Sequence, residues 1–533
     1  MMKEGNIASG MGVSCMNGAK VILSAINIFH RDPEHPFVFF HYFLMYPSQQ
    51  SSSRSLLQLE VIATCSFLPI GTTGLKMALT LKEEDAPHWV YRGEGAVNLV
   101  LAYTGSSSSY IGKVLRIRKA PRNGSESKGG VRNSIALTPQ ERLLWKDVDE
   151  LISSSDKEIA GQLYVQHVMK PLLGAKYVDA GMHVLVTREF LELVENNVLS
   201  QRPACRVDAA RVDTHCDFGL LMSDHSLFAN GSQGCGPCIS VEIKPKCGFL
   251  PLSRFISEGT AIKRRITRFE MHQALKLHQG EISQQSEYNP LDLFSGSKER
   301  ILKAIKGLFT TPQNNFRVFL NGSLILGGLG GVAKNTDVCI AEVFEDELKS
   351  VIQADDGLCT ENLFTLVTEA LQQSGVLDKL LEVQMLDNVD IEGVIHAYYD
   401  ITSQQCIVCS KLGEEQAKRY TALHSASLDE SLRIVKDYLI AATAKDCSLM
   451  LCFRPRNEDD SGSVYNNVYL ESTKQSFDVK VYFIDLDLKR LSKMEDYYEL
   501  DKKIVSCYRQ VIKMDQGRNE MTSLQASNSK AAN

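Results

Sequence analysis

The chain contains a short alternating segment, residues 239–246, that brings acidic and basic side chains together. In an extended conformation its apolar residues share one face, and the opposite face carries Glu242 and Lys244. A carboxylate and an ammonium group then point the same way, into solvent or a cleft. Pro245 ends the pairing of the strand and leaves Lys246 free to turn toward a ligand. An exposed, salt-bridged strand would give the same pattern, so this segment alone leaves both readings open.

A second segment, Arg92 to Asn98, predicts a Gly-x-Gly turn between two strands. The backbone amides of such a turn can approach nucleotide phosphates, although a turn that needs positive φ explains the glycines equally well. On the following strand, Arg116 projects on the face opposite Leu115 and Ile117. A cation on the strand after a glycine turn resembles the phosphate-contacting lysine of kinase N-lobes, which favours a nucleotide site.

Two aspartates follow predicted elements and are candidates for phosphoryl-transfer chemistry. Asp485 comes directly after an apolar run, which suits a metal ligand, and Asp446 follows an Ala-rich helical run. Phosphoryl transfer depends mainly on positioning and charge neutralisation, so a carboxylate base, a metal-binding aspartate and several cations are expected. Ordinary helix-capping or turn aspartates would look the same in the sequence.

A separate group of cysteines and histidines has metal-ligand spacing. His396, Cys406, Cys409 and His424 form the pattern His-x9-Cys-x2-Cys-x14-His. Two thiolates and two imidazoles suit tetrahedral zinc in a closed, structural site, against the alternative of free cysteines and surface histidines. The segment from Cys235 to Cys238 imitates a thioredoxin active site, but it runs into a predicted strand and no Trp precedes it, so we expect a loop.

The surrounding pattern predicts the elements that must position these residues in an α/β (α+β) fold. Thr138 and Ser427 are expected helix N-caps, the first followed by Pro139. The Gly-rich residues 327–331 predict a mobile loop. Predicted strands cover residues 97–103, 110–118, 238–246 and 477–484, and predicted helices cover residues 139–151, 297–308, 361–386 and 428–443.

Length and composition limit the class of protein. With 533 residues, 44% hydrophobic and 23% charged, the chain can bury a sizeable core in two or three lobes. The net charge of -6 argues against a nucleic-acid or membrane partner, yet residues 238–276 hold eight Lys or Arg against three Glu, which suits a small anionic ligand. Fourteen cysteines without a credible secretory signal indicate a reducing compartment. The apolar stretches 21–29 and 37–46 are far shorter than the roughly 20 residues of a membrane span.

The decapeptide Glu-Ile-Lys-Pro-Lys-Cys-Gly-Phe-Leu-Pro, residues 242–251, resembles the signature of inositol-pentakisphosphate 2-kinases, in particular the plant enzymes. The resemblance extends from about Met77 to Tyr508. It implies a two-lobed inositol phosphate kinase fold that uses ATP and magnesium to phosphorylate the 2-hydroxyl of inositol 1,3,4,5,6-pentakisphosphate, giving phytate. It also implies an inositide-binding helical subdomain and the structural zinc site.

The resemblance assigns roles to individual positions. It implies that Glu242 holds the ribose, that Lys244 contacts the transferring phosphate, that Asp446 accepts the hydroxyl proton and that Asp485 binds magnesium. The nucleotide would also contact the turn, the cation on the next strand and the hinge, namely Gly95, Ala96, Val97, Asn98, Arg116, Ser223, Asp224 and His225. The inositide would contact Arg206, Lys246, Lys276, Asn315, Arg317, Lys489, Lys493 and Tyr497, with Asn314 assigned to either ligand.

Composition and the resemblance together set expectations for the organisation of the chain. Composition changes at Met77, which we expect to be the functional start, with residues 1–76 a leader outside the fold. We expect an N-lobe with the ATP contacts in residues 77–224, a C-lobe with the inositide pocket, zinc site and catalytic aspartates in residues 225–512, and a disordered tail in residues 513–533. A monomer is expected because no coiled-coil pattern or long apolar seam is present. A cytoplasmic location is expected, and a nuclear one stays open.

Two positions depart from the family pattern. Ala96 replaces a loop glycine, which is tolerable if its φ stays negative, and Lys493 stands where plant relatives often have Arg, which loses a bidentate fork. Two alternatives stay open: a kinase of another inositol polyphosphate, and a non-catalytic inositide-binding protein. The presence of Asp446, Asp485 and Lys244 counts against the second.

Overall fold

The computed structural model describes residues 9–16, 19–26, 79–122, 136–228, 236–328, 338–355, 357–456 and 463–531. The chain divides into two compact units, Met1–Ala78 and Leu79–Asn533. In the first unit, β1 (Ser9–Met16) and β2 (Ala19–Ile26) pair antiparallel. Most of the expected leader, part of the expected loop 327–331 and Cys235 of the Cys-x2-Cys segment lie outside the described residues.

The second unit is mixed α/β and contains two sheets. The seven-stranded sheet has the order β3-β7-β9-β6-β5-β4, with β8 paired to β6, and only its β3–β7 pair is parallel. Its strands are β3 (Thr80–Leu81), β4 (Trp89–Glu94), β5 (Asn98–Tyr103), β6 (Lys113–Pro121), β7 (Met182–Val186), β8 (Ala210–Val212) and β9 (Phe218–Ser223).

The six-stranded sheet is antiparallel throughout, with the order β12-β11-β10-β13-β15-β14. Because β10 lies between two neighbours and is buried on both faces, the alternative of an exposed, salt-bridged strand for residues 239–246 is wrong. The strands are β10 (Ile239–Ile243), β11 (Phe316–Leu320), β12 (Ser323–Leu326), β13 (Ser448–Pro455), β14 (Asn466–Leu470) and β15 (Gln475–Ile484).

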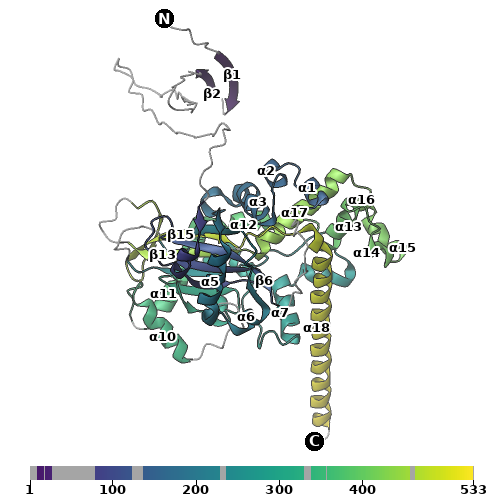
Figure 1. Ribbon diagram of the computed structural model, residues 1–533. Helices are drawn as coiled ribbons and strands as arrows, with labels where there is room; N and C mark the ends of the chain where they lie inside the picture. The colour runs from purple at the N-terminus through teal and green to yellow at the C-terminus, as the bar shows by residue number, and fades with distance from the viewer. Residues whose placement is uncertain are drawn as a thin grey trace, which may run out of the picture. The chain divides into compact units, whose positions relative to one another are not determined.

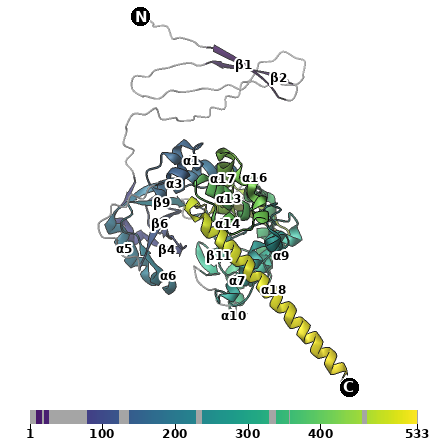
Figure 2. The same cartoon turned by 90° about the vertical axis from the view of Figure 1, so that its right-hand side faces the viewer.

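Helices cover both sheets. Figure 2, the view of Figure 1 turned by 90°, shows the seven-stranded sheet with α5 on one side of the unit and β11 with α7 and α9 on the other. The helices are α1 (Pro139–Leu144), α2 (Asp149–Ile152), α3 (Lys157–Tyr164), α4 (Lys170–Leu173), α5 (Arg188–Val198), α6 (Ala204–Ala209), α7 (Arg268–His278), α8 (Pro290–Leu293), α9 (Lys298–Thr310), α10 (Val338–Leu348), α11 (Cys359–Ser374), α12 (Val376–Gln384), α13 (Ile391–Ile401), α14 (Ile407–Ser410), α15 (Glu414–Ala417), α16 (Thr421–His424), α17 (Leu428–Asp446) and α18 (Met494–Ala531).

Each sheet has its own apolar core. The core of the seven-stranded sheet joins the strands to the inner face of α5, including Phe190 and Val194. The larger core joins the six-stranded sheet to helices from α1 to α17, with Phe316, Phe453 and Phe483 fully buried. Within the part of the chain that the structure describes, no helix is both long and apolar enough to cross a membrane.

Several predicted boundaries are confirmed, and others shift. Thr138 and Ser427 cap α1 and α17 by accepting hydrogen bonds from the backbone N–H groups of Glu141 and Glu430. The continuous helix predicted for residues 361–386 is wrong, because Gly375 adopts φ of 63° and separates α11 from α12. The backbone of α18 continues to Ala531, through most of the range where the sequence predicts a disordered tail.

Candidate active site

A cavity of about 980 Å³ lies among residues from both sheets. This volume is at the upper end of the roughly 300–1,000 Å³ of small-molecule sites. Most of the predicted nucleotide and substrate positions line it. They are Gly95, Ala96, Val97, Asn98, Arg116, Arg206, Ser223, Asp224, His225, Glu242, Lys244, Lys276, Asn314, Arg317, Asp446 and Asp485.

The glycine turn between β4 and β5 is fixed from behind by a buried ion cluster. The carboxylate of Glu94 accepts hydrogen bonds of 3.0 Å from two guanidinium nitrogens of Arg202 and another from Lys119, and all three side chains are at most 2% exposed. Burial opposes ionisation, but Arg202 and Lys119 outweigh it and lower the pKa of Glu94. The anchored carboxylate therefore holds the end of β4 in place.

The glycine of this turn leaves open space at the cavity. Gly95 does not adopt a positive φ, and a Cβ atom built there meets nothing within 4 Å. The alternative that this glycine serves a positive-φ turn is therefore wrong, and its missing side chain leaves room for a ligand. Ala96 likewise has no positive φ, so its departure from the family pattern is tolerated.

Arg116 connects the two sheets across the cavity. Its guanidinium donates a hydrogen bond of 2.6 Å to Asp487, which follows β15, and both residues line the cavity. Burial acts against the charge, but Asp487 and Asp485 outweigh it and raise the pKa of Arg116. The sequence reasoning missed Asp487, although it lies two residues after the predicted metal ligand.

The predicted hinge, Ser223 to His225, is held by Asp179. One carboxylate oxygen of Asp179 accepts a 3.0 Å hydrogen bond from the backbone N–H of Ser223 and lies 3.4 Å from Nε2 of His225. The imidazole of His225 stacks on Tyr482 at 3.8 Å between ring centroids. Asp224 pairs with Arg92 at 2.5 Å. Backbone atoms of the hinge are thus held at the cavity wall.

The ribose candidate Glu242 is buried and paired on β10. Its two oxygens accept hydrogen bonds from Arg317 at 2.9 Å and from the Ser448 hydroxyl at 3.1 Å. Both partners come from neighbouring strands, β11 and β13. The side chain is therefore held in place from two sides, and Glu242 lines the cavity.

Lysines converge on Asp446 at the end of α17. The Nζ atoms of Lys489 and Lys246 lie 2.8 Å and 3.9 Å from its carboxylate oxygens, and Nζ of Lys244 donates to its backbone carbonyl at 3.4 Å. Burial opposes ionisation, but Lys489 and Lys246 outweigh it and lower the pKa of Asp446. The carboxylate is therefore held in its anionic form.

Asp485 lies beside this cluster in a left-handed turn, with φ of 61°. Its carboxylate is 3.5 Å from Nζ of Lys244. Burial raises the pKa of Asp485, while the ammonium of Lys244 opposes that shift. A divalent cation would favour the carboxylate form, so this donor at the cavity wall fits a magnesium ligand.

The remaining predicted substrate positions lie outside the cavity lining. Asn315 is buried, its side-chain oxygen has no partner, and its backbone carbonyl accepts from the N–H of Lys244 at 2.9 Å. Tyr497 lies within electrostatic range of Lys489 and Asp446. Lys493, the residue directly before α18, is exposed and pairs with Asp496 in the first turn of that helix.

The helix α7 carries the predicted cation Lys276 and two further basic residues, Arg268 and His272, that the sequence reasoning did not assign to the site. Arg268, His272 and Lys276 lie at i, i+4 and i+8 and therefore share one face. Burial and the charges of Lys276, Arg268 and Lys246 lower the pKa of His272 to about 4. Similar crowding, with burial as the main cause, lowers the pKa of Lys246 to about 8. Cations that repel one another in this way indicate that the region is built for an anion.

The four predicted zinc ligands meet at one point. Their donor atoms all lie within 4.8 Å of one another. Nδ1 of His396 is 3.1 Å from Nε2 of His424, and the sulfurs of Cys406 and Cys409 are 3.3 and 3.4 Å from that same Nδ1 atom. A tetrahedral ion with bonds of about 2.0–2.3 Å needs donors separated by about 3.3–3.8 Å, so the set fits zinc.

A supporting contact orients one of these ligands. Nδ1 of His424 lies 2.8 Å from a carboxylate oxygen of Asp400, which leaves Nε2 to face the other donors. A carboxylate on the far nitrogen is the usual partner of a zinc-binding histidine. His396 stacks on Tyr420 at 3.8 Å, which fixes its ring plane.

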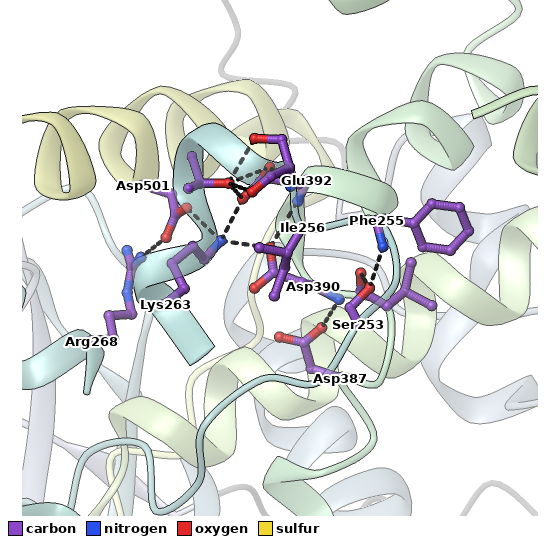
Figure 3. A network of polar contacts seen from close by, with 12 residues as sticks. Ser253, Phe255, Ile256, Lys263, Arg268, Asp387, Asp390, Glu392 and Asp501 are labelled. Carbon is purple, nitrogen blue, oxygen red and sulfur yellow. Dashed lines mark hydrogen bonds and ion pairs between the residues drawn. The ribbon is translucent and has the colours of Figure 1, made fainter. Parts of the chain in front are cut away.

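A second group of acidic side chains, Asp390, Glu392 and Asp501, surrounds the ammonium group of a lysine (Figure 3). Nζ of Lys263, on the 3-10 helix Glu258–Arg264, lies 2.6, 3.2 and 2.8 Å from the three carboxylates. Arg268 forms a further pair with Asp501. The ammonium group occupies the position that a metal ion would take. The ion pairs of this cluster therefore hold α7, α13 and α18 together.

Comparison with known proteins gives one consistent family. The sequence profile described as inositol-pentakisphosphate 2-kinase matches residues 91–503. An inositol-pentakisphosphate 2-kinase of Arabidopsis thaliana is 56% identical over 432 residues, covering 81% of this chain and 95% of that protein. A protein of the same name from Oryza sativa subsp. indica is 50% identical over 433 residues, covering 81% and 96%. One from Danio rerio is 30% identical over 490 residues, covering 81% and 95%.

Proposed function

The chain belongs to the inositol-pentakisphosphate 2-kinase family, and from this premise we propose that it transfers the γ-phosphoryl group of ATP to the axial 2-hydroxyl of inositol 1,3,4,5,6-pentakisphosphate, which gives the hexakisphosphate. The observation that carries the proposal is the convergence of Lys244, Lys246 and Lys489 on Asp446, which lines the cavity. This arrangement combines an ionised base with cations for a moving phosphate and a highly charged acceptor.

The nucleotide would lie under the turn formed by Gly95 to Asn98. The open space at Gly95 admits phosphate oxygens, and Arg116 would neutralise their charge. The adenine would contact the hinge, Ser223 to His225, and the ribose would contact Glu242. These positions line one continuous cavity, which supports a single site for the nucleotide.

The roles that we assign in the reaction follow from the charges of Asp446 and the lysines around it. The 2-hydroxyl oxygen forms a bond to the γ-phosphorus while the bond from that phosphorus to the ADP oxygen breaks, and Asp446 takes the hydroxyl proton. Lys489 and Lys246 keep Asp446 anionic and able to accept it. Lys244, between Asp446 and Asp485, would neutralise negative charge on the phosphoryl group during its transfer.

Two metal ions fit the donors present. Asp485 would hold magnesium, which neutralises phosphate charge when bound. His396, Cys406, Cys409 and His424 would hold a structural zinc ion, which would fix the segment between α13 and α17.

The acceptor would be recognised by cations from several elements. Five phosphates need several Lys and Arg side chains, and Arg adds bidentate contacts. The proposed contacts are Arg206, Lys246, Lys276, Asn314, Asn315, Arg317, Lys489, Lys493 and Tyr497. Lys493, exposed and already paired with Asp496, would have to turn toward the ligand to take part.

The same proposal covers the organisation of the chain. We assign an ATP-binding lobe to residues 77–224, an inositide-binding lobe with the zinc site to residues 225–512, and a role outside the fold to residues 1–76. The protein would act as a monomer in the cytoplasm or nucleus. A protein that starts at Met77 and lacks activity or stability would refute the assignment of the leader.

The test of the proposed function is the product of the unchanged protein and of Asp446→Ala. NMR of the product should place the new phosphate on the 2-position, and Asp446→Ala should lower kcat by about 10²–10⁴-fold while inositide binding stays unchanged. Asp429→Ala, an exposed aspartate at the other end of α17, is the control and should keep full activity. Phosphate on another position would favour a different inositol phosphate kinase, and retained activity of Asp446→Ala would remove it as the base.

A further inference from the structure

Gln384, the last residue of α12, is a buried amide with an unusual set of backbone partners. Its side chain has no solvent exposure. Oε1 accepts a hydrogen bond of 2.8 Å from the N–H of Gly248, and Nε2 donates to the carbonyls of Lys246 at 2.8 Å and Ala444 at 3.2 Å. One side chain thus holds two chain segments that are about 200 residues apart in sequence.

The first of these segments is the turn after β10. Lys246 adopts φ of 62°, a left-handed conformation that a side chain rarely takes without support. The turn is held on both sides of this residue, because the Tyr288 hydroxyl donates to the carbonyl of Pro245 at 2.6 Å and Gln384 binds Lys246 and Gly248. The direction of the Lys246 side chain therefore depends on these contacts.

The second segment is the end of α17, which carries Asp446. Gln384 binds the carbonyl of Ala444, two residues before that aspartate. The intervening Lys445 is held by the connection between α12 and α13, because its Nζ lies 2.6 Å from Asp387, three residues after Gln384. The backbone that presents Asp446 is therefore fixed to the corner between α12 and α13.

We propose that Gln384 is a positioning residue for phosphoryl transfer, which sets the placement of Lys246 relative to Asp446 by holding both of their backbones. The inference rests on the proposed function, in which these residues contact the acceptor and take its proton. Their side chains lie 3.9 Å apart. The pairing of β10 with β13 ends at Ile243 and Leu449, so Gln384 holds these two backbones beyond the end of that pairing. Gln384 is not among the residues that line the cavity, so we expect it to act through the backbones of Lys246 and Asp446.

The amide group suits this role because it supplies two donors and one acceptor. A carboxylate at the same place cannot donate to the two carbonyls, whereas a protonated carboxyl can donate to one of them and accept from Gly248. The charged groups on the segments concerned are Lys246, Lys445, Asp446 and Asp387, two of each sign. A substituted carboxyl there is consequently expected to bind its proton more readily than a solvated one, because it is buried.

The experiment compares Gln384→Met and Gln384→Glu with the unchanged protein, using pentakisphosphate and ATP as substrates. Both variants should lower kcat by about 10–100-fold, which is the scale of a misplaced reacting group, and raise KM for the inositide while KM for ATP changes less than twofold. Gln384→Glu should regain activity relative to the unchanged protein as pH falls from 8 to 6. Gln475→Met is the control, because that part-buried amide also binds two backbone groups, those of Gln353 and Val351. Gln475 begins β15, whose opposite end, Ile484, lines the cavity.

The inference is overturned if both Gln384 variants keep kcat within twofold, if KM for ATP rises as much as KM for the inositide, or if Gln384→Glu follows the pH profile of the unchanged protein. It is also overturned if neither variant folds while Gln475→Met does, since the amide would then be structural alone. Failure of the unchanged protein to phosphorylate pentakisphosphate would instead refute the proposed function.

Discussion

Replacing Lys263 with methionine should destabilise the protein strongly, because the ammonium group is shared by three buried carboxylates. Lys263 is 5% exposed, and Asp390, Glu392 and Asp501 are 8–9% exposed. Methionine keeps the length and apolar stem of the side chain, so the change removes mainly the charge. Figure 3 shows that the ammonium lies where the elements carrying these carboxylates meet.

The expected loss follows from the pairing. Removal of one partner from a buried ion pair costs about 3–5 kcal/mol, because the other charge is left buried without compensation. Arg268 still pairs with Asp501 in the variant, so one of the three carboxylates keeps a cation. We therefore expect a loss near the lower limit, about 3 kcal/mol in the free energy of unfolding.

The loss should depend on pH with a definite sign. Burial opposes the charge on Lys263, but Asp501, Asp390 and Glu392 outweigh it and raise its pKa. The folded-state pKa lies above the unfolded one, so the stabilisation is complete below the ordinary lysine pKa of about 10.4 and is lost only as pH rises through the folded-state value. In the variant, the three buried carboxylates lack this cation and repel one another, so protonation at lower pH relieves the repulsion. The difference between the two proteins should therefore shrink as pH falls.

Urea unfolding at pH 8 and pH 5.5 measures both effects. Lys379→Met on α12 is the matched control, because Lys379 forms an exposed pair with Glu382 at 2.9 Å, and its loss should stay under about 0.5 kcal/mol. A loss of less than about 1 kcal/mol for Lys263→Met at pH 8 would refute the reasoning, since it lies well below the cost of breaking a buried pair. A loss that grew at pH 5.5 would refute the proposed role of the carboxylates.

Two further predictions concern the proposed zinc site and the glycine turn. Elemental analysis should find zinc in the purified protein, and Cys409→Ser should lower both the zinc content and the melting temperature. Cys205→Ser, at an exposed position, is the control and should change neither. A metal-free protein of unchanged stability would contradict the site. Arg202→Met should leave Glu94 with Lys119 as its remaining cation, because the other side-chain contact of Glu94 is the neutral hydroxyl of Tyr91. The change should lower the free energy of unfolding by about 3 kcal/mol and raise KM for ATP more than KM for the inositide. Equal changes in the two KM values would show that the cluster does not act through the turn.

Sequence patterns predicted the features that depend on residues close together in the chain. The alternation in residues 239–243 identified a strand, and local capping signals located the starts of α1 and α17. The cysteine and histidine spacing identified four donors that the fold brings together. Each of these features depends on residues close together in the chain, so the alternation or spacing of residue types in the sequence is enough to predict it.

Features that depend on contacts between distant segments could not be predicted in this way. Nothing in the polar residue Gln384 distinguishes it from an exposed glutamine until the fold brings Lys246 and Ala444 to its amide. The break at Gly375 was missed because a glycine inside an apolar repeat gives the same pattern whether or not its φ is positive. The face shared by Arg268 and His272 was readable from their spacing, but its relation to the cavity was not.

The central position of β10 has a consequence for how the chain can vary. Its five residues have neighbours on both strand edges and on both faces, with Ile239, Val241 and Ile243 fully buried and Ser240 and Glu242 at most 7% exposed. A substitution there disturbs the packing of the six-stranded sheet as well as the chemistry at its end. A systematic library of variants should therefore show β10 among the least permissive segments, even at the positions that touch no ligand.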